Sequence, residues 1–271
     1  MKVTKFETFP VSVPYTREEV TWRVVRSGVS VVILKLTADN GLVGWGECCG
    51  SPDVAVAELA ARYCSEFVLG RDPWQKEEIA RDIFKMGSMD RRFRLANHVF
   101  AGIDQALWDL CGKECGQPVY RFFGGALRDE VTYFCYLAQG TPDEMKRQCA
   151  EGLKMGYDVF YLKVGIDTDA ETTMLEAVRD TVGPKAKVRV DVNEAWDLRQ
   201  SVRILNDWDA KFDLDFCEAP VPHDLPDAMR EVRERVTCGL CANDSLGREI
   251  DVLRIIRARC ADVLCFSSYW M

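Results

Sequence analysis

The sequence lacks several features that would place the protein in a common class. It has two histidines, His98 and His223, and its longest apolar stretches, such as 29–36, are far shorter than the roughly 20 residues of a membrane-spanning helix. Its net charge is −8, so we expect no general attraction to nucleic acid or to an anionic membrane. The N-terminus has no basic region followed by an apolar core, so we expect no signal peptide and a cytoplasmic location.

Cysteine is abundant, yet its distribution indicates neither disulfides nor zinc. The twelve cysteines are scattered through apolar runs, where a reduced thiol behaves as a small hydrophobic side chain. Cys238 and Cys241 have the spacing of a zinc-binding pair, but the sequence has no second such pair and too few histidines to complete a site. Cys48 and Cys49 lie beside a glycine-rich turn, and we keep Cys49 as a candidate for the border of a substrate pocket.

The first half of the chain, 1–130, is predicted to form a small α+β domain. Asn40 and Gly41 separate two β-rich runs, and this dipeptide between such runs predicts an antiparallel hairpin. Helical periodicity follows the hairpin. The expected strands are 3–13, 29–38 and 42–47, and the expected helices are 54–67, 74–86 and 96–115.

The second half, 131–271, alternates short β-rich runs with amphipathic helices, which predicts a parallel sheet with crossover helices. Thr141 followed by Pro142 marks one helix start, and Asp167 or Thr168 marks the next. The expected architecture is α/β, a (β/α) TIM-type barrel. Such a barrel needs eight units and roughly 250 residues, so we expect an incomplete barrel with about six of the eight strands. The expected strands are 131–137, 159–164, 188–192, 214–217, 239–242 and 262–266.

Polar side chains stand out at the carboxyl ends of these otherwise apolar strands. Such ends converge on the face where barrel active sites lie, and carboxylates brought close together there repel one another unless a cation holds them. Oxygen ligands with no Cys or His nearby suit Mg²⁺. The simpler alternative is that each charge reaches solvent. The strand-end set comprises Lys163, Asp191, Asn193, Glu218, Asn243 and Asp244.

The segment 101–110, Ala-Gly-Ile-Asp-Gln-Ala-Leu-Trp-Asp-Leu, resembles the signature of the mandelate racemase/muconate lactonizing enzyme family of the enolase superfamily. The hairpin around Trp45 is similar to that of the family's capping domain, and the motifs at Lys163, Asp191 and Glu218 follow in the family's order. The resemblance implies a capping domain (1–130), a barrel domain (131–271) and a homo-oligomer. It also implies bound Mg²⁺ and abstraction of the α-proton of a small-molecule carboxylate through an enolate-like intermediate.

The sequence departs from the family at three places. The family usually has Lys-x-Lys where this chain has Tyr161 and Lys163, so the candidate base is kept and its cationic neighbour is lost. The third metal ligand is either Asn243 or Asp244, and we favour Asp244 because an ionised carboxylate holds Mg²⁺ more strongly than an amide oxygen. Ser267 stands where the family has a second lysine, and serine without an activating partner is a very weak base.

These departures favour a one-base reaction. Lys163 would remove the α-proton and then protonate a departing β-hydroxyl on the same face, a syn dehydration of a β-hydroxy acid or a hydroxylated amino acid such as a hydroxyproline. Trp22 could offer its ring to an ammonium group. The resemblance implies that the loops at 15–27 and 48–53 select the substrate. The alternatives are a racemase, epimerase or cycloisomerase of the same family, a module that only binds Mg²⁺, and a non-catalytic truncated remnant. His98 is interpreted as structural, and His223 as a residue that could reach the pocket.

Overall fold

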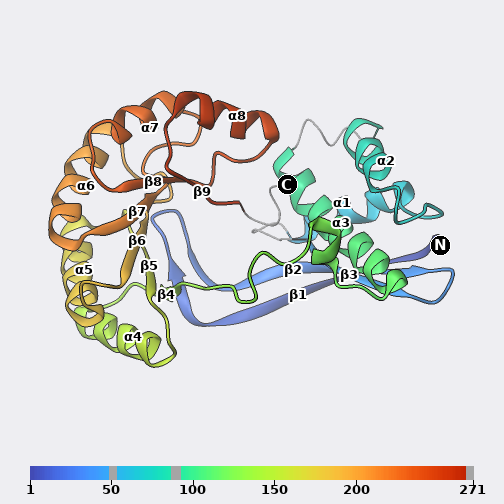
Figure 1. Ribbon diagram of the computed structural model, residues 1–271, viewed down its shortest axis with the longest axis horizontal. Coiled ribbons are helices and arrows are strands. Elements are labelled where there is room, and N and C mark those ends of the chain that lie inside the picture. The colour runs from blue at the N-terminus through green and yellow to red at the C-terminus, as the bar shows by residue number, and fades with distance from the viewer. Residues whose placement is uncertain (49–53, 87–92, 267–271) are drawn as a thin grey trace. The chain divides into compact units, whose positions relative to one another are not determined.

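The computed structural model describes residues 1–48, 54–86 and 93–266 (Figure 1). The chain divides into two compact units. One contains 1–14 and 28–130, and the other contains 15–27 and 131–266. Residues 15–27 were expected to form a loop after the first strand. They belong to the second unit, although the residues on either side of them belong to the first. The two units are described separately.

The first unit combines a three-stranded sheet, in the order β1-β2-β3, with helices. Strands β2 and β3 pair antiparallel, with Thr37 opposite Val43, which confirms the hairpin expected from Asn40 and Gly41. The strands are β1 (Val3–Val20), β2 (Val25–Ala38) and β3 (Val43–Cys48), and the helices are α1 (Val54–Cys64), η1 (Ser65–Phe67), α2 (Lys76–Arg81), the π-helical η2 (Asp82–Met86), α3 (Phe93–Cys115) and η4 (Val119–Phe123).

Helix α3 packs directly against β3 because glycines face each other at the contact. A Cβ atom on Gly46 would lie 1.9 Å from the carbonyl oxygen of Gly102, and a Cβ on Gly44 would lie 2.1 Å from that of Ala106. No real side chain occupies such space, so only glycine allows the two backbones to approach this closely. Around this contact, buried aliphatic side chains of β2, α1 and α3 form the core of the unit.

The second unit is a six-stranded sheet in the order β4-β5-β6-β7-β8-β9, parallel throughout, with its helices along the outer side of the curved sheet (Figure 1). The fold class expected from the sequence is confirmed, an α+β domain followed by a partial (β/α) barrel. The strands are β4 (Cys135–Leu137), β5 (Val159–Lys163), β6 (Lys187–Asp191), β7 (Leu214–Glu218), β8 (Gly239–Ala242) and β9 (Val263–Leu264), and the helices are α4 (Pro142–Lys154), α5 (Thr168–Val182), α6 (Leu198–Phe212), α7 (Pro226–Arg233) and α8 (Glu249–Ala258).

The helix starts follow the local sequence signals. The Thr141 hydroxyl accepts from the Glu144 N–H while the Glu144 carboxylate accepts from the Thr141 N–H, a complete capping box at the start of α4. The Asp167 carboxylate caps α5 by accepting from two backbone N–H groups. Both starts agree with the sequence analysis.

Several expected elements have different bounds in the structure, and two strands illustrate the reasons. The strand expected at 131–137 begins only at Cys135, because 131–134 are mostly exposed and have no paired neighbour in the part of the chain that the structure describes. The strand expected at 3–13 continues to Val20. Its second half is largely exposed, so its side chains do not alternate between a buried and an exposed face, and the sequence gives no strand signal there.

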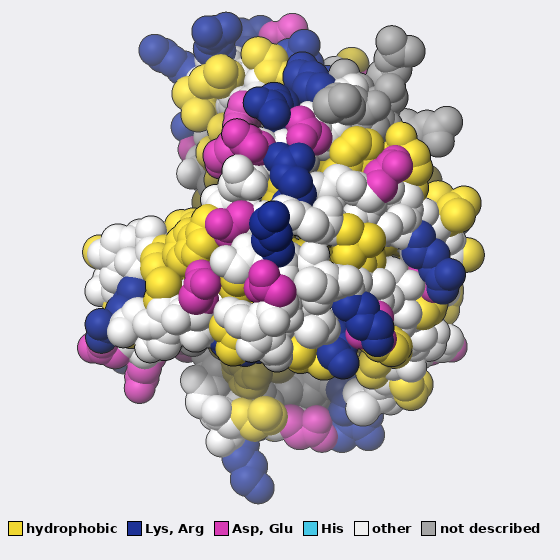
Figure 2. Space-filling model, turned by 90° about the vertical axis from the view of Figure 1, so that its right-hand side faces the viewer, with side chains coloured by type: hydrophobic (Ala, Val, Ile, Leu, Met, Phe, Trp, Pro, Cys, Tyr) yellow, Lys and Arg dark blue, Asp and Glu magenta, His cyan; other side chains and the backbone are white. Residues whose placement is uncertain are grey.

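Among the described residues, no helix has the length and apolar character needed to cross a bilayer. On the face shown in Figure 2, acidic and basic side chains are interspersed, with hydrophobic groups between them.

We expect Gly46→Ala to destabilise the protein by about 1–3 kcal/mol, because the added methyl group would force α3 away from β3. Urea unfolding should show a lower midpoint than for the wild type. The control is Glu47→Ala, at the neighbouring exposed position of β3, which should leave the midpoint almost unchanged. Equal midpoints for the two variants would contradict the close-contact interpretation.

Candidate functional site

The carboxyl ends of three adjacent strands bring together Lys163, Asp191 and Glu218. Lys163 lies opposite Asp191 in the β5–β6 register, and Asp191 lies opposite Glu218 in the β6–β7 register. The Lys163 Nζ atom is 2.6 Å from Asp191 Oδ2. Asp191 is 1% exposed and Glu218 is 6% exposed, so both carboxyl groups are almost completely removed from solvent.

Tyr161 lies beneath this group and bonds both carboxylates. Its hydroxyl donates to Asp191 Oδ2 at 2.6 Å and also lies 3.1 Å from Glu218 Oε2. The Tyr161 ring stacks on Phe134, with the ring centroids 4.6 Å apart. The phenol that replaces the expected lysine therefore contacts the two predicted metal ligands.

Burial and mutual charge shift the titration of these groups. Burial and the neighbouring Asp191 carboxylate raise the pKa of Glu218 to about 8. Burial raises the pKa of Tyr161 well above its usual value, and Asp191 adds to this effect. For Lys163, burial lowers the pKa, but the attraction of Asp191 and Glu19 outweighs it, so the pKa of the amine is raised. These surroundings favour the charged, ammonium form of Lys163.

Asn193 follows β6 and holds Lys163 from a second side. Its Oδ1 atom accepts from Lys163 Nζ at 2.9 Å, and its backbone N–H donates to Asp191 Oδ1 at 2.8 Å. Its carbonyl oxygen accepts from the Trp22 indole N–H at 2.7 Å. The guanidinium of Arg23 lies 5.0 Å from the centre of the Trp22 ring, so a cation already occupies one face of this side chain. The roles of Asn193 and Trp22 toward substrate stay predictions.

Asn243 and Asp244 follow β8, the next strand of the sheet. The Asn243 side-chain amide donates to the carbonyl oxygen of Cys265 at 2.9 Å. The described residues contain no cluster of three His, Cys, Asp or Glu side chains arranged to hold a metal, so Asp244 does not join Asp191 and Glu218 in such a cluster. The choice between Asn243 and Asp244 as third ligand stays a prediction. Cys49 and Ser267 lie outside the described residues.

Two acidic residues near the site, Glu19 and Glu194, were not predicted from the sequence. Glu19 Oε1 is 3.9 Å from Lys163 Nζ, and Glu194 directly follows Asn193 and binds His223, whose Nδ1 lies 2.6 Å from Glu194 Oε1. His223 thus contacts a residue next to the strand-end group. Local pattern gave no signal for Glu19, because its proximity to Lys163 depends on how residues 15–27 fold back onto the second unit.

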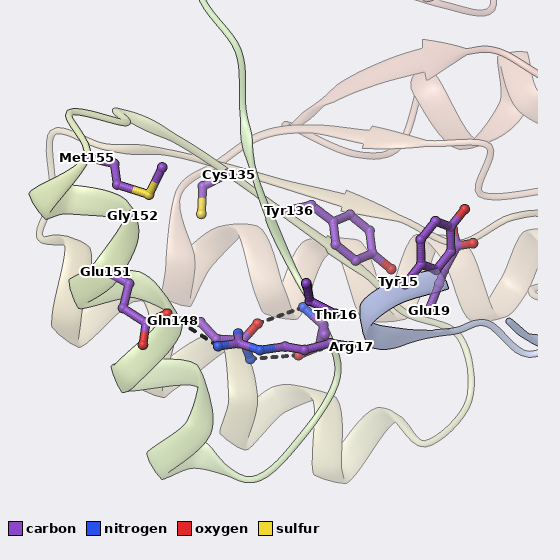
Figure 3. A pocket seen from close by; sticks show the side chains of 11 residues that line it. Tyr15, Thr16, Arg17, Glu19, Cys135, Tyr136, Gln148, Glu151, Gly152 and Met155 are labelled. Carbon is purple, nitrogen blue, oxygen red and sulfur yellow. Dashed lines mark hydrogen bonds and ion pairs between the residues drawn. The ribbon is translucent and has the colours of Figure 1, made fainter. Parts of the chain in front are cut away.

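A cavity of about 790 Å³ extends along β4 and α4 (Figure 3). Tyr136, Tyr15 and Glu19 lie together on one side of it, and an ion pair of 3.3 Å between Arg17 and Glu151 crosses the other. Glu19 connects the cavity with the strand-end group through its contact with Lys163. The remaining lining residues are Thr16, Cys135, Ala138, Gln148, Gly152 and Met155.

Comparison with protein-family models gives two matches along the chain. Residues 6–124 match the N-terminal domain of mandelate racemase / muconate lactonizing enzyme, and residues 144–270 match the "Enolase C-terminal domain-like" family. The two matched ranges follow one another in the same order as the two units of the structure.

Curated relatives include enzymes with different reactions. The N-succinyl-L-Arg/Lys racemase of Bacillus cereus is 27% identical over 97% of this chain and 71% of its own length, and its crystal structure matches with a TM-score of 0.87. A cis-3-hydroxy-L-proline dehydratase of Roseibium aggregatum is 30% identical over 76% of this chain and 56% of its own length. This chain therefore spans about 70% of the racemase and little more than half of the dehydratase.

A solved dipeptide epimerase from Enterococcus faecalis, described as complexed with Mg and the dipeptide L-Leu-L-Tyr, matches with a TM-score of 0.91. The match covers 100% of this chain and 75% of the epimerase at 22% identity, so it is a likeness of fold.

In metal-free protein, we expect stability to fall as the pH rises from 4.5, the ordinary pKa of a glutamate, to about 8. In this window the folded protein keeps on Glu218 a proton that the unfolded chain has already released, so raising the pH favours unfolding. Melting temperatures measured in EDTA across this range should decline more steeply for the wild type than for Glu218→Gln, which cannot ionise. Identical pH profiles for the two proteins would contradict the assignment to Glu218.

Proposed function

The chain belongs to the mandelate racemase/muconate lactonizing enzyme family of the enolase superfamily, and on that basis we propose that it abstracts the α-proton of a small-molecule carboxylate with the help of Mg²⁺. The observation that carries the proposal is the convergence of Lys163, Asp191 and Glu218 at three adjacent strand ends. It places one amine beside two buried carboxylates, which are the groups that this chemistry needs.

The residues present fit a hard divalent cation. Asp191 and Glu218 are buried together, and their mutual repulsion contributes to the raised pKa of Glu218, which a cation would relieve. A third oxygen would come from Asp244 or from the amide oxygen of Asn243, whose nitrogen already donates to Cys265. When bound, Mg²⁺ would supply positive charge that holds the substrate carboxylate and stabilises negative charge developing on it.

Lys163 is the residue that we propose to move the proton. Among the described residues, it is the one lysine that contacts Asp191, and Asn193 fixes its Nζ atom from another side. Tyr161 stabilises the two carboxylates by donating a hydrogen bond to Asp191 and approaching Glu218. The amine must be neutral to accept the α-proton, and the resulting ammonium can then return a proton on the same face.

We further propose that the reaction is a syn dehydration. Lys163 breaks the α-C–H bond, the electron pair forms the C=C bond as the β-C–O bond breaks, and the ammonium protonates the departing hydroxyl to give water. The absence of a lysine at position 267 and the similarity to the cis-3-hydroxy-L-proline dehydratase support this assignment. Racemisation or epimerisation is the second candidate, favoured by the relative that matches 97% of this chain.

The experiment is proton NMR in D₂O with Mg²⁺ and two probes, cis-3-hydroxy-L-proline and N-succinyl-L-lysine. Dehydration predicts loss of hydroxyproline and formation of its dehydrated product. Deuterium incorporation at Cα of N-succinyl-L-lysine together with its D-enantiomer would instead establish racemisation and contradict the dehydratase assignment. Absence of both α-proton exchange and elimination with these probes and a wider panel of α-hydrogen acids would contradict the proposed chemistry.

We expect Lys163→Met to lower the rate of α-proton exchange by about 10²–10⁴-fold, because the variant removes the group that accepts the proton. The matched control is Lys187→Met, on the exposed first residue of β6, which should retain the wild-type rate. Equal losses in the two variants would argue against a direct role for Lys163.

A further inference from the structure

Glu194 is a buried carboxylate, 9% exposed, at the turn that leaves β6. Asn193 and Glu194 both have positive φ angles, 46° and 68°, a region that residues other than glycine rarely adopt. The Glu194 N–H donates to the carbonyl oxygen of Ala219 at 2.8 Å, which ties the turn to the end of β7. Such a turn persists only where its surroundings hold it in place.

Both oxygens of the Glu194 carboxylate are bonded, and the partners come from two different segments. Oε1 accepts from the backbone N–H of His223 at 2.7 Å and contacts the His223 ring. Oε2 accepts from the guanidinium of Arg23. These bonds replace the contacts with water that a side chain at this depth has lost.

Arg23 belongs to the tip of the β1–β2 hairpin, 21–24, which is closed by a bond of 3.0 Å from the Thr21 N–H to the carbonyl oxygen of Val24. The tip binds two consecutive residues of the turn. Trp22 donates to the carbonyl oxygen of Asn193, and Arg23 donates to Glu194. Since the side chain of Asn193 holds the Lys163 amine, the tip and the amine are fastened to the same residue.

We propose that Glu194 is a positioning residue whose buried carboxylate fastens the hairpin tip to the end of β6 and thereby holds Asn193 against the Lys163 amine. Its catalytic consequence rests on the function proposed above, in which Lys163 moves the proton. The attachment itself, made by Trp22, Arg23, Glu194 and His223, does not depend on that function.

The test compares Glu194→Gln with Glu151→Gln. Glu151 is a suitable control because it also pairs with an arginine of the 15–27 segment, Arg17, but at the surface. Competitive acetylation with acetic anhydride, read by mass spectrometry, measures the reactivity of Lys163 relative to the exposed Lys187 in the same molecule. We expect Lys163 to react several-fold faster in Glu194→Gln and at the wild-type rate in Glu151→Gln.

The rate of trypsin cleavage after Arg23 and Arg26 measures how firmly the hairpin tip is held against the end of β6. We expect the folded Glu194→Gln protein to be cut there faster than the wild type or Glu151→Gln. If Glu194→Gln does not fold, Arg23→Met removes the same ion pair from its exposed side. This variant has lost the Arg23 cleavage site, so it should show faster acetylation of Lys163 and faster cleavage after Arg26. Unchanged Lys163 acetylation and unchanged cleavage in a folded variant of either residue would overturn the proposal.

Kinetics separate positioning from general destabilisation. In enzyme that circular dichroism shows to be fully folded, Glu194→Gln should lower kcat for α-proton exchange by about 10–100-fold, with a smaller change in KM. A wild-type kcat in this variant would contradict the role in positioning Lys163. If the wild type itself exchanges no α-proton, the proposed function fails, whereas acetylation and cleavage still decide the role of Glu194 because neither needs substrate.

Discussion

The site depends on the burial of two carboxyl groups, Asp191 and Glu218, side by side at the ends of adjacent strands. Two such groups cannot both be charged in a desolvated place unless positive charge or a proton compensates them. Lys163 and the Tyr161 hydroxyl compensate the charge of Asp191, and the raised pKa of Glu218 favours its protonated, uncharged form. In the function proposed above, a divalent cation would relieve the repulsion that this strand register creates.

Tyr161 distinguishes this site from the Lys-x-Lys pattern to which the sequence is similar. A lysine at position 161 would put a second cation beside Lys163, whereas the phenol is neutral and donates a hydrogen bond to Asp191. The consequence is an amine whose surroundings are predominantly anionic, with Asp191, Glu19 and Glu218 all raising its pKa. Neutralising these anions is therefore what Lys163 needs in order to act as a base.

Much of this arrangement could be predicted from the sequence. Alternating β-rich runs and helices predicted the parallel sheet, and polar residues at its strand ends predicted the meeting of Lys163 with Asp191 and Glu218. Glu19 and Glu194 could not be predicted, because Glu19 contacts Lys163 and Glu194 contacts Arg23 across more than a hundred residues of sequence. The length of β1 also escaped prediction, since its exposed second half has no apolar alternation.

The most direct test of the central claim is a thermal melt in Mg²⁺ compared with EDTA, for the wild type and for Asp191→Asn. A cation that binds only the folded protein raises its stability by mass action. Our account predicts that Mg²⁺ raises the wild-type melting temperature and that Asp191→Asn loses most of this rise. A wild-type melting temperature that is the same in saturating Mg²⁺ and in EDTA would contradict the claim that Asp191 and Glu218 form a cation site.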